Sequence, residues 1–230
     1  LLQQIDPDVL GVEALVDQAG NQAGNQALVE FEWVGWSEPL EGGTITRGAN
    51  QTSVDALVVA RVPNGRRAYL IEWKYLESYR YPDDKAAGAS GQTRRRRYAG
   101  LFAHPRSSFS TATALEDHLQ EPFYQIMRLL LLRDRTLARG VSPQLPVDEA
   151  RVLVVCPKAN QDYRLAIDGT RLKARFPGRT RVQDLVRTSL KDPSAFAIVS
   201  QEALVQGLRS SSIAAQIQPW LAYHRDRYGW

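Results

Sequence analysis

The sequence predicts an α/β fold, because a β-hairpin in the first third of the chain is followed by a long amphipathic helix. Two apolar, β-branched runs, Val54–Val62 and Arg67–Tyr75, flank a Pro-Asn-Gly turn. An Asn-Gly pair between two such runs is the strongest short-range signal for a hairpin. Residues 121–139 instead carry apolar side chains at helical spacing. Strands and helices therefore share one chain of 230 residues.

The residues before the hairpin predict one helix and one strand. A helix is expected from Val9 to Asp17, since apolar residues recur there at helical spacing after an Asp-Pro-Asp start. The tandem Ala-Gly-Asn-Gln repeat of residues 19–26 fits either a loop or a continued polar helix. Residues 28–35 alternate as a strand, with Phe31 and Trp33 on one side, and residues 36–51 read as a connecting loop.

The residues after the hairpin predict a loop, a helix and a strand. Residues 78–112 lack hydrophobic periodicity, so we expect a long loop there, and loops of this length are usually functional or disordered. The helix Glu121–Arg139 has proline in its first turn and basic residues in its last, as the helix dipole favours. Val152–Cys156 reads as a short buried strand.

The last third of the chain predicts smaller elements. We expect a helix at Val182–Leu190, a strand at Ala195–Ser200, a helix at Glu202–Leu208 and an amphipathic helix at Ile213–Tyr228. We predict one domain over residues 1–230, with a core at about 9–157 and a C-terminal α/β extension at about 158–230.

Three charged residues of the hairpin are expected to converge. A two-residue loop at residues 64–65 would set Leu57 opposite Glu72 and Asp55 opposite Lys74. Side chains two apart on a strand share a face, so Asp55, Glu72 and Lys74 would form one patch. Two carboxylates can hold Mg²⁺, and a lysine beside them can stabilise the charge of a phosphodiester under attack. The alternative is a solvated strand face with a weak ion pair.

Asp55 followed by Glu72-Trp73-Lys74 after a hairpin resembles the PD-(D/E)XK nuclease superfamily. In detail the chain is most similar to uncharacterised bacterial restriction-endonuclease-like proteins. Val54 stands where the superfamily usually has proline. The resemblance implies a restriction-endonuclease-like αβββαβ core, with a mixed sheet flanked by helices. It also implies Mg²⁺ as cofactor, with Mn²⁺ as a substitute.

The resemblance implies roles for three further residues. Gln125, near the start of the long helix, corresponds to a position that bears an active-site group in many members. Glu32 or Glu30 would supply a further metal contact, although an exposed strand face is the simpler explanation. Arg128 would contact a phosphate. The alternative for Gln125 and Arg128 is an ordinary amphipathic helix surface.

Arg94, Arg95, Arg96 and Arg97 form the strongest basic cluster. Arginines bind phosphate through paired hydrogen bonds, and tyrosines near them, such as Tyr79 and Tyr98, would suit stacking on bases or sugars. A solvated basic loop explains the cluster equally well. Residues 164–181 hold a second local excess of basic residues that could contact a nucleic-acid backbone.

Composition narrows the classes of protein to which the chain can belong. The net charge is +4 and the sequence pI is about 9.3. A single cysteine, Cys156, forms no intrachain disulfide, which fits a reducing cytoplasm, and three histidines lack the spacing of zinc ligands. No apolar run reaches membrane length. The chain begins Leu-Leu rather than Met, so we expect a piece of something longer.

Together these features predict a Mg²⁺-dependent nuclease acting on DNA, with RNA, exonuclease action and a homodimer left open. The resemblance suggests a role in restriction or defence. One alternative is a catalytically silent nucleic-acid-binding module of the same fold. Another is a protein-interaction domain whose basic residues meet an acidic partner. A glycosidase with paired carboxylates would give Lys74 no evident role.

Overall fold

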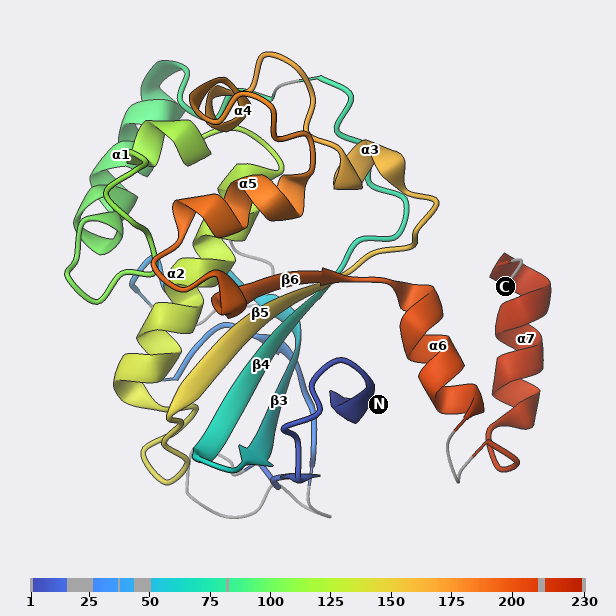
Figure 1. Ribbon diagram of the computed structural model, residues 1–230. Coiled ribbons are helices and arrows are strands. Elements are labelled where there is room, and N and C mark those ends of the chain that lie inside the picture. Colours follow the sequence, from blue (N-terminus) through green and yellow to red (C-terminus); the bar gives the residue numbers. More distant parts are fainter. Residues whose placement is uncertain are drawn as a thin grey trace.

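A six-stranded mixed sheet forms the centre of the molecule (Figure 1). The computed structural model describes residues 2–15, 27–36, 38–43, 51–81, 83–210 and 214–228. Within these ranges the strands are β1 (Gly11–Val12), β2 (Glu30–Trp33), β3 (Val54–Val62), β4 (Gly65–Trp73), β5 (Glu149–Val155) and β6 (Phe196–Val199). The order is β1-β3-β4-β5-β6, and β2 also pairs with β3. The hairpin is antiparallel, whereas β5 and β6 run parallel to β4.

Helices flank this sheet, which confirms the predicted α/β class with a mixed sheet flanked by helices. The helices are α1 (Gly88–Phe102), α2 (Phe123–Arg139), α3 (Gln161–Arg164), α4 (Arg171–Arg175), α5 (Val182–Ser189), α6 (Gln201–Arg209) and α7 (Gln218–Tyr228). Short 3₁₀ helices occur at η1 (Leu2–Gln4), η2 (Leu115–His118) and η3 (Pro193–Ala195). The predictions for α2, β5, α5, β6 and α6 are confirmed within a few residues. The last helix begins at Gln218, because residues 214–217 form turns, and the predicted start at Ile213 lies outside the described residues.

The hairpin is present, but the predicted register is wrong by two residues. Val62 pairs with Gly65, so the loop consists of residues 63–64, and Leu57 lies opposite Leu70. Proline suits the first inner position of a type I turn, and Gly65 supplies the positive φ of 129° that follows it. An even shift leaves each side chain on its predicted face, because the side-chain period of a strand is two.

Two predictions near the N-terminus are wrong in part. Residues 9–15 are not helical: they contain β1, whose neighbour Leu10 donates its N–H to the carbonyl of Arg61 in β3. Backbone pairing with the sheet has overridden the helical spacing of the valines. Residues 16–17 and the repeat at 19–26 lie outside the described residues. In β2 the alternation fails, because Glu32 has a φ of 54° and Phe31 is exposed while Trp33 is buried.

The long loop predicted for residues 78–112 is also wrong, because helix α1 occupies the middle of this range. Within α1 only Gly91 and Tyr98 are buried. A helix that buries so little has no apolar stripe, so the hydrophobic periodicity that marks a helix is missing from its sequence. The arginine cluster therefore lies on a helix.

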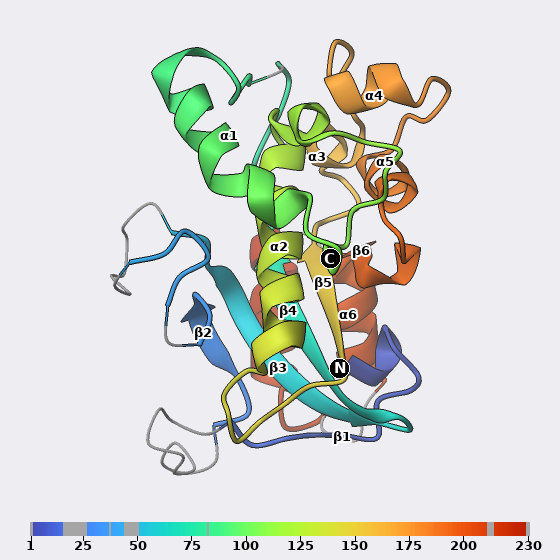
Figure 2. The ribbon, with the colours of Figure 1, turned by 90° about the vertical axis from the view of Figure 1, so that its left-hand side faces the viewer.

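The two faces of the sheet are covered differently. The larger core packs α2 against one face, and the hairpin contributes Leu57, Val59 and Leu70 to it. The N-terminal segment and α6 cover the other face, where Leu2, Val9 and Leu204 pack against the hairpin and β5. Figures 1 and 2 show α1, α3 and α4 beyond the end of the sheet at which β4 and β5 finish. That end is therefore surrounded by helices from both halves of the chain.

The outer edge of β6 is closed by side chains of α5. The N–H of Ile198 donates to Oε1 of Gln183 at 2.7 Å. The carbonyl of Phe196 accepts from Nε of Arg187 at 2.9 Å. Side chains of α5 thus satisfy two backbone groups of this strand edge that a further strand would otherwise pair with.

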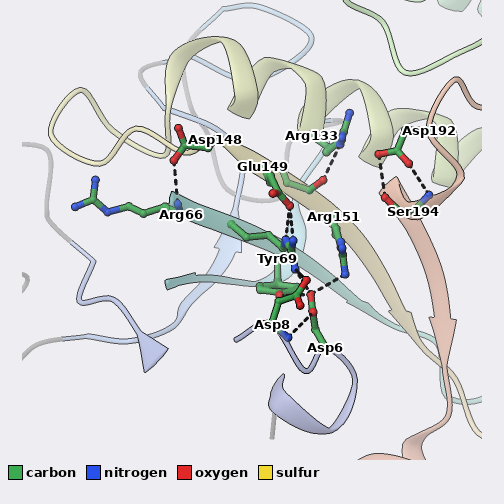
Figure 3. Close-up of polar contacts among 12 residues, drawn as sticks. Asp6, Asp8, Arg66, Tyr69, Arg133, Asp148, Glu149, Arg151, Asp192 and Ser194 are labelled. Carbon is green, nitrogen blue, oxygen red and sulfur yellow. Dashed lines mark hydrogen bonds and ion pairs between the residues drawn. The ribbon is translucent and has the colours of Figure 1, made fainter. Parts of the chain in front are cut away.

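A buried charged cluster, here called the Asp6 network, fastens the N-terminal segment to the start of β4 (Figure 3). Oδ2 of Asp6 accepts hydrogen bonds from Tyr69, Arg67 and Arg151 at 2.5, 2.5 and 2.6 Å. Arg67 also donates from Nε to Glu149 at 2.6 Å. Burial alone would raise the pKa of Asp6, but the hydrogen bonds from Tyr69 and Arg67 outweigh it and lower that pKa.

Candidate active site

The end of β4 places two oppositely charged side chains inside the protein. Glu72 and Lys74 are only 5% and 6% exposed. Nζ of Lys74 lies 2.8 Å from Oε1 of Glu72. The N–H of Lys74 donates to the carbonyl of Val155, so this residue keeps the strand direction beyond the last residue of β4. Both side chains therefore point to the same side of the sheet, as predicted.

Asp55 joins this pair from the neighbouring strand. Continuing the observed register by one residue sets Asp55 opposite Glu72, not opposite Lys74 as predicted. Oδ2 of Asp55 accepts the N–H of Trp73, the residue between Glu72 and Lys74, at 2.6 Å. The charge of Asp55 also contributes to raising the pKa of Glu72, so the two carboxylates act on each other. The register correction brings them closer together than the prediction did.

Helix α2 delivers a third side chain to Glu72. Nε2 of Gln125 donates to Oε1 of Glu72 at 2.8 Å. The apolar residues of α2 that the sequence indicated are all buried against the sheet: Phe123, Ile126, Met127, Leu130 and Leu131. This packing fixes the helix and aims its first turn at the end of β4. Glu72, Lys74 and Gln125 are thus in direct contact, with Asp55 beside them.

The pKa values of Glu72 and Lys74 are shifted, and burial and ion pairing explain both shifts. Burial raises the pKa of Glu72, and the neighbouring Lys74 only partly opposes this. Burial alone would lower the pKa of Lys74, but the charge and the hydrogen bond of Glu72 outweigh it, so the pKa of Lys74 is raised. The lysine is therefore held as a cation inside the fold.

The sequence did not predict a role in this site for Glu77 and Tyr79, which act on Lys74, or for Glu121, which acts on Tyr79. Oε1 of Glu77 lies 3.5 Å from Nζ of Lys74. Burial, followed by the charge of Glu121, raises the pKa of Tyr79 to about 12, so its phenol stays protonated. Burial also raises the pKa of Glu121, which accepts the backbone N–H of Gln125. The available sequence signal for Glu77 was its position three residues after Lys74.

Mg²⁺ fits the donor set of this site. The hydrogen bonds described above engage Oδ2 of Asp55 and Oε1 of Glu72, and each carboxylate has a second oxygen. Mg²⁺ is commonly bound by one or two carboxylates together with waters and substrate phosphates. The register of β2 sets Glu32 beside Asp55, with its side chain exposed. Among the described residues no three His, Cys, Asp or Glu side chains form a metal-binding group, so Glu32 does not complete a three-residue cluster with the other two.

The predicted phosphate-binding arginines fall into two groups. Arg96 and Arg97 are exposed on α1, whereas Arg94 and Arg95 donate to the backbone carbonyls of residues 85 and 86. Arg128 is partly buried, and its guanidinium donates to Thr52 at 2.9 Å and pairs with the carboxylate of Glu41. Tyr98, expected to stack on bases, is fully buried. Of the five predicted phosphate-binding arginines, Arg96 and Arg97 are therefore the exposed ones.

A comparison with models of protein families identifies the family of the chain. A family model described as a restriction endonuclease associating with ARP matches residues 1–229. The chain belongs to this family. The resemblance drawn from Asp55, Glu72 and Lys74 to restriction-endonuclease-like proteins is thereby confirmed. No curated protein and no solved structure matches the chain.

In the part of the chain that the structure describes, no helix has the length and apolar character needed to cross a membrane.

Proposed function

We propose that this restriction-endonuclease family member is a Mg²⁺-dependent nuclease that hydrolyses phosphodiester bonds in DNA. One observation carries the proposal. The buried pair Glu72–Lys74 at the end of β4 is bound by Gln125 of α2 and faces Asp55 of β3. A buried ion pair serves stability poorly, because desolvation of both charges offsets their attraction. Its position at the end of the sheet, with a second carboxylate, instead suits chemistry on a charged substrate.

Each residue has a distinct role in this proposal. Asp55 and Glu72 would hold Mg²⁺, which polarises the phosphodiester and lowers the pKa of a bound water. Lys74 keeps its positive charge beside Glu72 and would stabilise the negative charge that grows on the phosphate during attack. Gln125 orients Glu72 through its amide, as partners behind a metal ligand commonly do.

The proposed substrate and partner rest on the position of α1 and on the description of the family. The exposed Arg96 and Arg97 of α1 lie on a helix at the same end of the sheet as the site, which suits contact with a DNA backbone (Figure 2). The description of the family names association with ARP, and we extend this association to the present chain as part of the proposal.

The proposal is tested by cleavage of supercoiled plasmid with Mg²⁺, Mn²⁺ or EDTA. Wild type is compared with Glu72→Gln, which keeps an acceptor for Lys74, and with the control Glu202→Gln on α6. We expect metal-dependent nicking that Glu72→Gln reduces by about 10²–10³-fold and Glu202→Gln leaves unchanged. Equal activity of wild type and Glu72→Gln would contradict the assignment of the site.

Binding measured in parallel separates the alternatives. Tight, salt-sensitive DNA binding without cleavage would favour a catalytically silent binding module. Neither cleavage nor DNA binding would favour a protein-interaction domain.

A further inference from the structure

The segment that follows β4 is held in place by the C-terminal extension. Residues 74–81 leave the candidate site and run beside α3 (Figure 1). Nδ2 of Asn160 donates to the backbone carbonyls of Tyr75 at 3.3 Å and of Glu77 at 3.2 Å. One side chain from the extension therefore fixes two peptide groups immediately after Lys74.

The side-chain oxygen of Asn160 is hydrogen-bonded as well. Its Oδ1 accepts the N–H of Tyr163 at 3.1 Å and so caps the start of α3. The oxygen faces an N–H and the nitrogen faces two carbonyls, so the orientation of the amide is determined by its partners. Asn160 thereby couples the position of α3 to the position of the segment.

Two further contacts reinforce this attachment. Oδ2 of Asp162 accepts from Oγ of Ser78 at 2.8 Å and from Nε of Arg80 at 2.9 Å. These groups are exposed, and exposed ion pairs contribute little on their own. The rings of Tyr79 and the fully buried Tyr163 pack 5.7 Å apart. The segment is thus bound along its length to α3.

The attached segment carries groups that act on Lys74. Glu77 lies 3.5 Å from its ammonium, and Tyr79 is half-buried beside it. Electrostatic interaction links the Tyr79 hydroxyl to Lys74 and to Glu72. The segment therefore supplies part of the low-dielectric environment in which the Glu72–Lys74 pair sits.

We propose that Asn160 is a positioning residue of the candidate active site, which holds residues 75–77 so that they close over Lys74. The expected change in kcat rests on the proposed nuclease function, whereas the closure over Lys74 does not depend on that function. It makes α3, at the start of the extension at residues 158–230, part of the site.

Two substitutions separate positioning from helix capping. Asn160→Ser and Asn160→Asp both keep an oxygen that caps α3, and both remove the amide that binds Tyr75 and Glu77. Only Asn160→Asp adds a charge. We expect each variant to lower kcat of plasmid cleavage on the order of 10–100-fold, with KM for DNA unchanged. A similar loss in both variants assigns the effect to the missing amide.

Labelling of Lys74 tests the closure independently of cleavage. Treatment with an amine-acylating reagent, followed by peptide mass spectrometry, gives the acylation rate of each lysine. Lys191, which donates to two backbone carbonyls elsewhere in the fold, is the reference. We expect Lys74 to react several-fold faster in Asn160→Ser, with Lys191 unchanged. Wild-type cleavage and wild-type labelling in both variants would overturn the inference. Faster labelling in a protein whose wild type does not cleave would support the closure and overturn the nuclease proposal.

Discussion

Strand β4 carries one buried charged cluster at each end, and the two clusters differ in how fully their carboxylates are bound. At the start of the strand, one oxygen of Asp6 accepts three hydrogen bonds from cationic or phenolic donors. At the end, Glu72 is bound by Lys74 and Gln125 and lies beside a second carboxylate, Asp55. The first cluster joins the N-terminal segment to the sheet, whereas the second brings like charges together.

The pKa directions express the same difference. Donors around Asp6 lower the pKa of its carboxyl, so its ionised form is well stabilised. Burial raises the pKa of the Glu72 carboxyl more than Lys74 lowers it, so its ionised form lacks full compensation. A carboxylate that lacks compensation gains most from a cation, which is the arrangement expected of a metal-binding site. Burial alone therefore does not distinguish a structural charge from a functional one.

Removal of Asp6 should give the largest effect on stability. Asp6→Ala leaves the buried Arg67 without one of its two close carboxylate partners and removes the acceptor of Tyr69, so we expect a loss of about 3–5 kcal/mol in the free energy of unfolding. Urea denaturation followed by tryptophan fluorescence measures it. Asp8→Ala is the matched control, because Asp8 is 53% exposed and 3.5 Å from Arg67. Losses of equal size in the two variants would refute the distinction drawn for the Asp6 network.

Removal of Gln125 should affect cleavage more than stability. Gln125→Ala deletes the amide that orients Glu72, and we expect a cleavage rate lower by roughly 10–100-fold. Gln183→Ala, which removes an amide from the outer edge of β6, two strands away from β4, serves as control. Plasmid cleavage and thermal unfolding are measured on both. A Gln125→Ala protein that cleaves at the wild-type rate would remove Gln125 from the site.

Acidification should affect the two clusters in different pH ranges. The pKa of Glu72 lies above its usual 4.5, so its protonation should weaken Mg²⁺ binding while the fold is still intact. The pKa of Asp6 lies below its usual 3.8, so its stabilising contribution is present above that value and is lost only as the pH falls further. Mg²⁺ titration calorimetry between pH 8 and 5, with unfolding curves between pH 7 and 2, compares them. Loss of stability before loss of Mg²⁺ binding would contradict this order.

The sequence predicted best the elements whose buried face is marked by a regular pattern of apolar side chains. The bounds of β3 and the buried face of α2 follow from runs of apolar residues at a fixed period. The faces of Asp55, Glu72 and Lys74 were right even with the wrong register, because an error of two residues preserves the face of a strand. The candidate site was therefore accessible from the sequence.

The remaining features depend on contacts between distant parts of the chain. Residues 9–15 join the sheet because β3 offers hydrogen bonds to them, and α1 forms without an apolar stripe. The turn followed the preference of Pro63 for the first inner position rather than that of the Asn-Gly pair. The attachment of Tyr75 and Glu77 to Asn160 spans more than 80 positions of sequence, and no local pattern indicates it.

The closed edge of β6 bears on how the molecule behaves in a crowded solution. An unpaired strand edge can recruit a strand from a second molecule, and such pairing initiates aggregation and domain swapping. Gln183 and Arg187 occupy the positions on β6 where such a strand would bind. Two side chains of a single short helix thus act against intermolecular sheet growth at this edge, in addition to covering the core.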